Sequence, residues 1–149
     1  MSLIAYDDIY ASFLGNITDI KLANMDELDA TAYAKLLLRD ACAEPKVSRL
    51  FSELVYDDDN ETLGYKLNSG DDDDRFVVLV LGLGMVCQWI EPQVQNTLDL
   101  HQLFTGSDQK FFSQSSHMAE KMNMRSDAEV KLDRILKDYK ATHNSYLNN

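Results

Sequence analysis

The spacing of apolar residues along this chain predicts mainly helices. In the first segment apolar residues recur at every third or fourth position, which places them on one face of a helix from residue 6 to about 17: Tyr6, Ile9, Tyr10, Phe13, Leu14 and Ile17. A second helix begins near Asp26 or Asp29 and ends by Glu44, because Pro45 disfavours helical backbone at the residue before it. Its apolar residues are Leu28, Tyr33, Leu36, Leu37 and Ala41.

Residues 46–70 give the weakest pattern. The spacing of their first apolar residues fits a further short helix, formed by Val47, Leu50, Phe51, Leu54 and Val55. Leu63, Tyr65 and Leu67 alternate with Gly64 and Lys66, so the pattern is also compatible with a brief extended piece. Two runs of aspartates fall in residues 57–74, and we expect this span to form a mobile acidic loop.

A strongly apolar third helix follows the second acidic run. Asp71–Asp74 suit a helix N-terminus, where carboxylates face unpaired N–H groups and the positive end of the dipole. From there to about Glu91 the chain is apolar almost all round, which predicts a central place in the bundle. Glycine costs roughly 1 kcal/mol in a helix interior. We therefore expect a neighbouring helix to approach closely at Gly82 and Gly84.

Pro92 predicts a corner and the start of a fourth helix, because a proline in the first turn loses no hydrogen bond. This helix ends in the loop Thr105–Asp108, which leads to a polar turn carrying Phe111 and Phe112. The last helix begins within residues 113–116 and runs past Tyr139. Its apolar stripe contains Met118, Met122, Ala128, Leu132, Ile135, Leu136 and Tyr139.

These elements together predict an all-α fold. We expect one domain over residues 1–149, a compact bundle of about five helices with a long C-terminal helix and an acidic loop in the middle. Two prolines and six glycines favour long helices over a turn-rich β-sandwich. Residues 1–3 are interpreted as a cloning remnant, and residues 144–149 as a frayed tail.

The charge balance excludes several kinds of partner. With 25 acidic and 14 basic residues the net charge is −11, which does not suit a protein that grips nucleic-acid phosphates or anionic membranes. We expect no signal peptide, because the first residues lack a basic stretch followed by an apolar run. The longest apolar run, Phe76–Met85, is expected to be too short to span a bilayer. Cys42 and Cys87 are predicted to be buried thiols. A soluble protein of a reducing cytoplasm is therefore expected.

No catalytic or cofactor motif is complete. Leu81–Gly84 resembles the start of a dinucleotide fingerprint, but position 87 is Cys where a third glycine is needed. An EF-hand loop counted from Asp57 fails, because Thr62 and Asn68 stand where Gly and Glu are required. The three histidines lack a helical metal-binding partner: His101, His117 and His143. We expect no metal, no cofactor and no enzymatic activity.

Adjacent bulky residues give the candidates for an interaction site. Phe111 and Phe112 follow each other, so both side chains cannot point inward, and one of them is predicted to be exposed. Met122 and Met124 are two positions apart on the predicted helix, so they too cannot both point inward. Methionines suit adaptable interfaces. The candidate interaction residues are Lys110, Phe111, Phe112 and Met124.

The order of segments and several motifs resemble the small head–tail connector (neck or adaptor) proteins of tailed bacteriophages and prophages. The resemblance is carried first by Tyr6, Ile9, Phe13, Ile17 and Asp19. It continues in Leu83–Val86, Trp89-Ile90 and Pro92, then in Asn96, Leu98 and Leu103, in Ser107-Asp108 and Lys110–Ser113, and in Tyr139. It skips residues 45–75, where the acidic runs have no counterpart.

This resemblance implies a helical protomer without enzymatic activity that assembles into a ring below the portal. Its expected partners are other copies of itself, the phage portal and tail-side proteins, with packaged DNA only passing through the channel. It also implies a place in the bacterial cytoplasm during assembly and then in the virion. The charges of the long C-terminal helix, such as Glu129 with Arg134, could supply contacts between subunits. The alternative function is a stand-alone acidic helical module that binds or regulates a basic partner.

Overall fold

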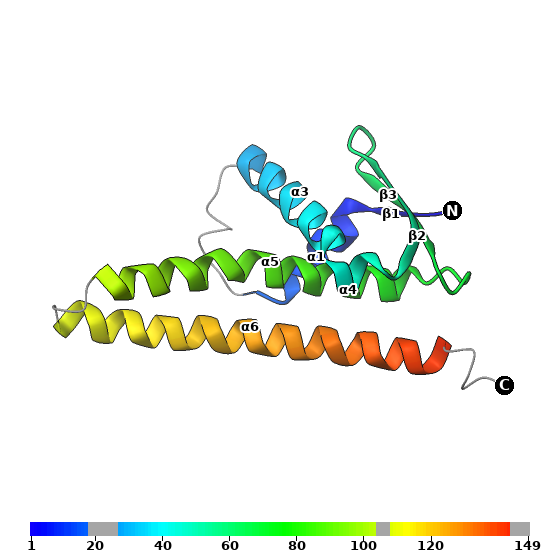
Figure 1. The fold of residues 1–149 in the computed structure, drawn as a ribbon. Helices are drawn as coiled ribbons and strands as arrows, with labels where there is room; N and C mark the ends of the chain where they lie inside the picture. Colours follow the sequence, from blue (N-terminus) through cyan, green and yellow to red (C-terminus); the bar gives the residue numbers. More distant parts are fainter. Residues whose placement is uncertain (18–26, 104–107, 144–149) are drawn as a thin grey trace.

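The fold is mixed α/β. A computed structural model describes the backbone of residues 1–17, 27–103 and 108–143, and the side chains of residues 1–17, 30–94 and 120–143. Its elements, labelled as in Figure 1, are β1 (Ser2–Ala5), α1 (Tyr6–Gly15), α3 (Glu27–Ala43), α4 (Pro45–Ser48), β2 (Phe51–Asp57), β3 (Thr62–Leu67), α5 (Asp74–Leu103) and α6 (Asp108–His143). The all-α prediction is wrong, because β1, β3 and β2 form a three-stranded antiparallel sheet in that order.

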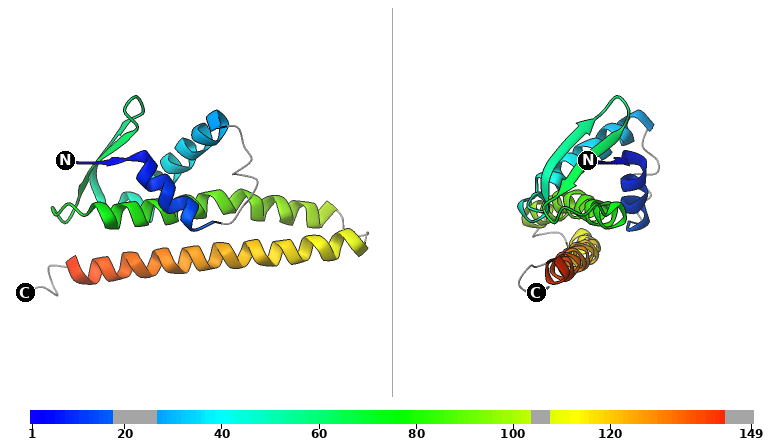
Figure 2. Two further views of the ribbon diagram at one scale, coloured as in Figure 1. Left: turned by 180° about the vertical axis from the view of Figure 1, so that it is seen from behind. Right: turned by 90° about the vertical axis from the view of Figure 1, so that its right-hand side faces the viewer.

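The elements form three layers, with α5 in the middle (Figure 2). The helix α6 runs antiparallel along one side of α5, and the sheet, α1 and α3 lie on the other side. This arrangement follows from the apolar sequence of α5, whose residues from Val80 to Val86 are all buried. A helix that is apolar all round needs neighbours on every side, so the predicted central position of this helix is confirmed.

The two glycines of α5 mark close helix packing, as the sequence predicted. A Cβ atom at Gly82 would lie 2.8 Å from Cβ of Ser12 and 3.2 Å from the backbone nitrogen of Phe13, both on α1. A Cβ atom at Gly84 would lie 3.1 Å from Cβ of Ala41 on α3. The absence of side chains therefore lets α1 and α3 approach the same central helix from two directions.

A β-hairpin replaces both the predicted short helix and the predicted acidic loop. Only Pro45–Ser48 is helical, and Phe51–Asp57 forms strand β2, which pairs with the predicted extended piece, β3. A β-bulge between Phe51 and Glu53 puts Phe51 and Leu54 on the same face of the sheet at a spacing of three residues. That spacing imitates one face of a helix, which explains the wrong prediction.

Residues 1–3 contribute to the fold. Ser2–Ala5 pairs with β3, with Leu3 opposite Gly64 and Ile4 opposite Leu63. Ile4 is buried, whereas Leu3 stands on the outer face of the sheet. The pairing joins two segments that are about sixty residues apart in the chain, and no local pattern signals such a contact.

The corner predicted at Pro92 does not form. Helix α5 continues through Pro92 to Leu103, so the expected third and fourth helices are one. The side-chain amide of Gln93 donates a hydrogen bond to the carbonyl of Trp89 at 3.2 Å, close to where the proline interrupts the backbone ladder. Helix α6 begins at Asp108, several residues before its predicted start. The predicted tail, residues 144–149, lies outside the described residues.

The second acidic run begins α5, as predicted. Oδ1 of Asp73 accepts a hydrogen bond from the backbone N–H of Phe76 at 3.1 Å, and its carbonyl accepts one from Val77. Asp73 thus satisfies donors that an unprotected helix end leaves unpaired.

Part of α5 is long and apolar enough to cross a membrane. Among the described residues, Asp74–Val94 meets that test with a mean hydropathy of 1.5, and 61% of the tested window is buried inside the protein. The helix is longer than the apolar run recognised in the sequence. The central helix of a water-soluble protein has the same length and composition, so this property alone is weak evidence for a membrane span.

Candidate functional site

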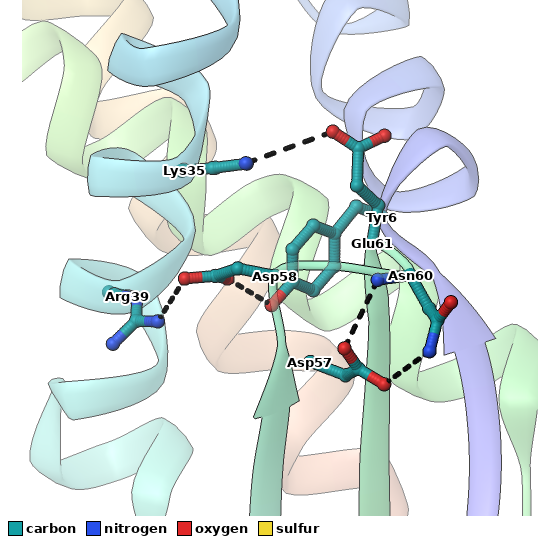
Figure 3. A network of polar contacts seen from close by, with 7 residues as sticks. All are labelled: Tyr6, Lys35, Arg39, Asp57, Asp58, Asn60 and Glu61. Carbon is teal, nitrogen blue, oxygen red and sulfur yellow. Dashed lines mark hydrogen bonds and ion pairs between the residues drawn. The ribbon is translucent and has the colours of Figure 1, made fainter.

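The densest polar network lies at the tip of the β2–β3 hairpin (Figure 3). Asp58 accepts a hydrogen bond from Tyr6 on α1 at 2.8 Å, and one from Nη2 of Arg39 on α3 at 2.7 Å. Glu61 lies 3.8 Å from Nζ of Lys35, which is also on α3. The hairpin tip is therefore held to two helices that precede it in the sequence.

The turn itself is closed by local bonds. Both carboxylate oxygens of Asp57 accept hydrogen bonds from Asn60, one from the backbone N–H at 3.1 Å and one from the side-chain amide at 2.8 Å. Glu61 has a φ of 53°, in the left-handed region. Its carbonyl accepts a hydrogen bond from the backbone N–H of Tyr6 at 2.8 Å. An exposed acidic run in the sequence thus has a defined structure.

These contacts shift the ionisation of the groups involved. The hydrogen bond from Tyr6, together with the charge of Arg39, lowers the pKa of Asp58, and the bonds from Asn60 lower the pKa of Asp57. Burial and the bond to Asp58 raise the pKa of Tyr6. At neutral pH the aspartates are therefore charged and the tyrosine is neutral, which is an arrangement for holding elements together rather than for moving protons.

Tyr10 lies next to this network without joining it. Its ring is 6.1 Å from that of Tyr6, and within the described part of the chain its buried hydroxyl has no hydrogen-bond partner. Burial, with the charges of Glu61 and Asp58 nearby, raises the pKa of Tyr10. The neutral hydroxyl is the form that such acidic surroundings favour.

A second polar contact joins the sheet to α5. Oδ1 of Asp74 accepts hydrogen bonds from Ser2 at 2.7 Å and from Tyr65 at 2.5 Å. Burial and this bond raise the pKa of Tyr65 to about 12. One carboxylate therefore connects β1, β3 and the start of the central helix.

The two cysteines are separate, and both are poor nucleophiles. Cys42 is buried on α3, and Cys87 is half-buried on α5. Burial raises the pKa of each thiol to about 11, so both are protonated at neutral pH. Among the described residues, no three His, Cys, Asp or Glu side chains are grouped to hold a metal ion.

Helix α6 is attached to the body through one stripe. Its inner residues pack against the core: Met124, Ala128, Leu132, Ile135, Leu136 and Tyr139. The ring of Tyr139 stacks on Phe76 of α5 at 4.1 Å and on His143 at 3.9 Å. Two ion pairs at 3.2 Å support the attachment, Arg125 with Glu91 and Lys46 with Asp133. No other described element covers the opposite face of α6 (Figure 2).

The structure separates the predicted interaction residues. Lys110, Phe111 and Phe112 belong to the first turns of α6 rather than to a turn before it, and their side chains lie outside the described residues. Met124 is half-buried against the core, whereas Met122 is the exposed member of that pair. Met124 contributes to a hollow of about 390 Å³ between α1, α5 and α6, with Asn16, Leu83 and Val86 in its wall.

An apolar face that the sequence analysis missed lies on the outer side of the sheet. Leu3, Gly64 and Val55 stand side by side on β1, β3 and β2, and Met1 approaches Gly64 on the same side. Leu3 and Val55 are 66% and 45% exposed. The alternation of Leu3 and Ile4 is a possible signal, but from the sequence alone residues 1–3 are interpreted as a remnant.

The chain was compared with family models, with curated proteins and with solved structures, and none of them matches it. The arguments for a function therefore rest on the surfaces described above and on the motifs in the sequence.

Proposed function

We propose that this chain is a non-catalytic assembly protein, the protomer of a head–tail connector ring between the portal and the tail of a bacteriophage or prophage. The observation that carries this proposal is that exposed apolar side chains stand on two different elements, the sheet and α3, where no described residue covers them. One is the outer face of the sheet, with Leu3, Gly64 and Val55. The other is on α3, where Leu36 is 55% exposed, with the exposed Ala32 one turn before it and the exposed Asp40 one turn after it.

Two different faces on one protomer are what a ring requires. A contact between unlike surfaces repeats from subunit to subunit, and it closes into a ring when the rotation is suitable. The sheet and α3 are neighbours in one layer (Figure 1), where Arg39 of α3 stands over the ring of Tyr56, and Val55, the residue before Tyr56, is on the opposite face of the sheet. We propose that the sheet face of one copy contacts α3 of the next.

The positions that resemble connector proteins support the same proposal. Most of them lie on the helices α1, α5 and α6, and not in the sheet that the sequence analysis missed. Several are packing residues: Phe13 and Trp89 meet edge to face at 6.3 Å, and Gly84 accommodates Ala41. The mixed fold changes the expected architecture around these helices without displacing them.

The proposal includes partners and location. The chain would act in the bacterial cytoplasm during assembly and then in the virion, in contact with the portal and with tail-side proteins. Packaged DNA would pass along the ring without specific binding, because a chain with a net charge of −11 repels phosphates.

The experiment that tests this function is removal of the gene from the parent phage or prophage, followed by electron microscopy of the particles. We expect DNA-filled heads and free tails that fail to join, with restoration by the wild-type chain. A Leu3→Asp/Val55→Asp variant should fail to restore joining, whereas Leu14→Asp, at an exposed position on α1 outside both faces, should restore it. Normal joined particles without the gene would refute the proposal.

An acidic module that binds a basic partner is the second candidate. The acids at the hairpin tip and before α5 favour it, because Asp59, Asp71 and Asp72 are exposed. Binding to a polybasic peptide that is stronger than binding to the portal, and that is lost in salt, would support this alternative.

A further inference from the structure

We propose that the outer face of α6 is a self-association surface, through which two copies of this chain pair in antiparallel orientation around a two-fold axis at Val130. This contact is separate from the sheet and α3 faces, so it stands whether or not the chain joins a portal ring. The occupant of the face is a second copy of the same helix.

None of the described residues covers this face, and its centre is apolar. Val130 is 62% exposed, and it points away from the stripe that packs on α5. Neighbouring exposed positions at helical spacing continue the same face: Asn123, Ser126, Asp127, Arg134, Lys137 and Ala141, of which Asn123 and Asp127, at its edge, also border the hollow between α6, α5 and α1. Small residues at Ser126 and Ala141 permit a second helix to approach closely. End on, α6 forms the outermost layer of the molecule on its side (Figure 2).

The charges on this face change sign at Val130. On the N-terminal side the exposed charges nearest to it are Asp127 and Glu129. On the C-terminal side Arg134 and Lys137 lie on the face itself, and the exposed charges at its edges, Lys131, Asp133, Asp138 and Lys140, are two bases and two acids. Asp133 is already bonded to Lys46, which strengthens the positive excess.

This polarity makes the face complementary to itself in one orientation only. With a two-fold axis at Val130, the two valines meet, and Asp127 lies level with Arg134 of the second copy, on the same flank. The axis repeats this pair, so two ion pairs flank one apolar contact. A parallel arrangement would instead place acids against acids and bases against bases.

A single helix face supports a weak and salt-sensitive dimer. Stable interfaces bury about 1,200–2,000 Å², and exposed ion pairs contribute little in high salt. We therefore expect dimerisation of the intact chain that depends on concentration and is stronger in low salt, measured by sedimentation equilibrium up to about 1 mM protein.

A charge swap tests the pairing. Asp127→Arg and Arg134→Asp should each raise the dissociation constant about tenfold or more, because two attractive pairs become repulsive. The double variant should restore dimerisation, since the swapped charges again attract. Lys66→Glu, on the sheet beyond α5, is a control that changes surface charge outside the face, and circular dichroism checks that each variant is folded.

Crosslinking tests the geometry. Val130→Cys should form a disulfide-linked dimer under mild oxidation, because the axis brings this position next to its own copy. Ala141→Cys lies on the same face but far from the axis, so it should crosslink only in a parallel pair. The wild-type chain controls for Cys42 and Cys87. A strict monomer at about 1 mM in low salt, a dimer indifferent to the charge swap, or crosslinking at position 141 but not 130 would each overturn the proposal.

Discussion

At the scale of single residues, the absence of a side chain is as important as its presence. Gly82 and Gly84 lie two positions apart on α5 and contact different helices, yet the space around them differs. The nearest atoms to a Cβ at Gly82 include the backbone of α1, whereas at Gly84 the nearest atom is the small Cβ of Ala41. Backbone cannot move aside cheaply, so the two sites should respond differently to the same substitution.

Gly82→Ala should therefore destabilise the protein by about 1–3 kcal/mol, the usual cost of overpacking a core. Gly84→Ala should change the free energy of unfolding by less than about 1 kcal/mol, because the gain in helix propensity offsets the tighter contact with Ala41. Urea denaturation of both variants measures the difference. Equal effects at the two positions would contradict the described packing.

The charge of Asp58 should give stability a specific dependence on pH. Its pKa is lowered in the folded protein, so its contribution is present above the ordinary value near 3.8 and is lost as the pH falls through the folded-state pKa. The difference in unfolding free energy between the wild type and Asp58→Asn should be constant above about pH 5 and should shrink below about pH 4. Asp59→Asn, which removes the same charge from the next position, is the matched control for the loss of one negative charge at the hairpin tip.

At the scale of elements, the start of α5 and the pairing of β2 with β3 each have an identifiable physical cause. The acidic run before α5 predicted the helix start because the chemistry of helix ends is local. Strand β2 was predicted as a helix because a bulge reproduces helical spacing, and Pro92 was predicted as a corner although the helix continues. Local rules therefore predicted the start of α5 correctly, but they could not predict that β2 pairs with β3.

The start of α5 provides the prediction at this scale. Asp73→Ala should cost about 0.5–2 kcal/mol of stability, the usual cost of removing an N-cap side chain. Asp72→Ala removes an equal charge from the adjacent exposed position. The hydrogen bonds described at the start of α5 are accepted by Asp73 and not by Asp72. Asp72→Ala should lower the free energy of unfolding by at most a few tenths of a kcal/mol. Thermal unfolding of both variants distinguishes capping from a general effect of charge.

At the scale of the whole molecule, the sequence predicted the helical part and missed the sheet. The positions of α1 and α3, the start of α5 and the later part of α6 follow from periodicity, the acidic run and Pro45, whereas the continuation of α5 through Pro92 and the start of α6 at Asp108 do not. The sheet depends on contacts between β1 and β3, which no local pattern encodes. The same limit applies to the candidate site: Tyr6 and Asp58 are 52 residues apart, and their hydrogen bond is visible only once the chain is folded.

The proposed function also belongs to this scale, because it concerns the faces that a folded protomer presents. The sheet and α3 would make the contacts around a ring, and α6 would pair free copies. A protein of this kind has its activity in assembly, so it should be assayed as part of a complex.

The most direct test is the mass of the complex formed when the purified chain is mixed with its cognate portal, measured by native mass spectrometry and imaged in negative stain. We predict a ring of many copies seated on the portal, with the mass of the portal increased by a whole number of chains that matches its symmetry. A chain that stays free of the portal at every concentration, and forms no ring, would contradict the account.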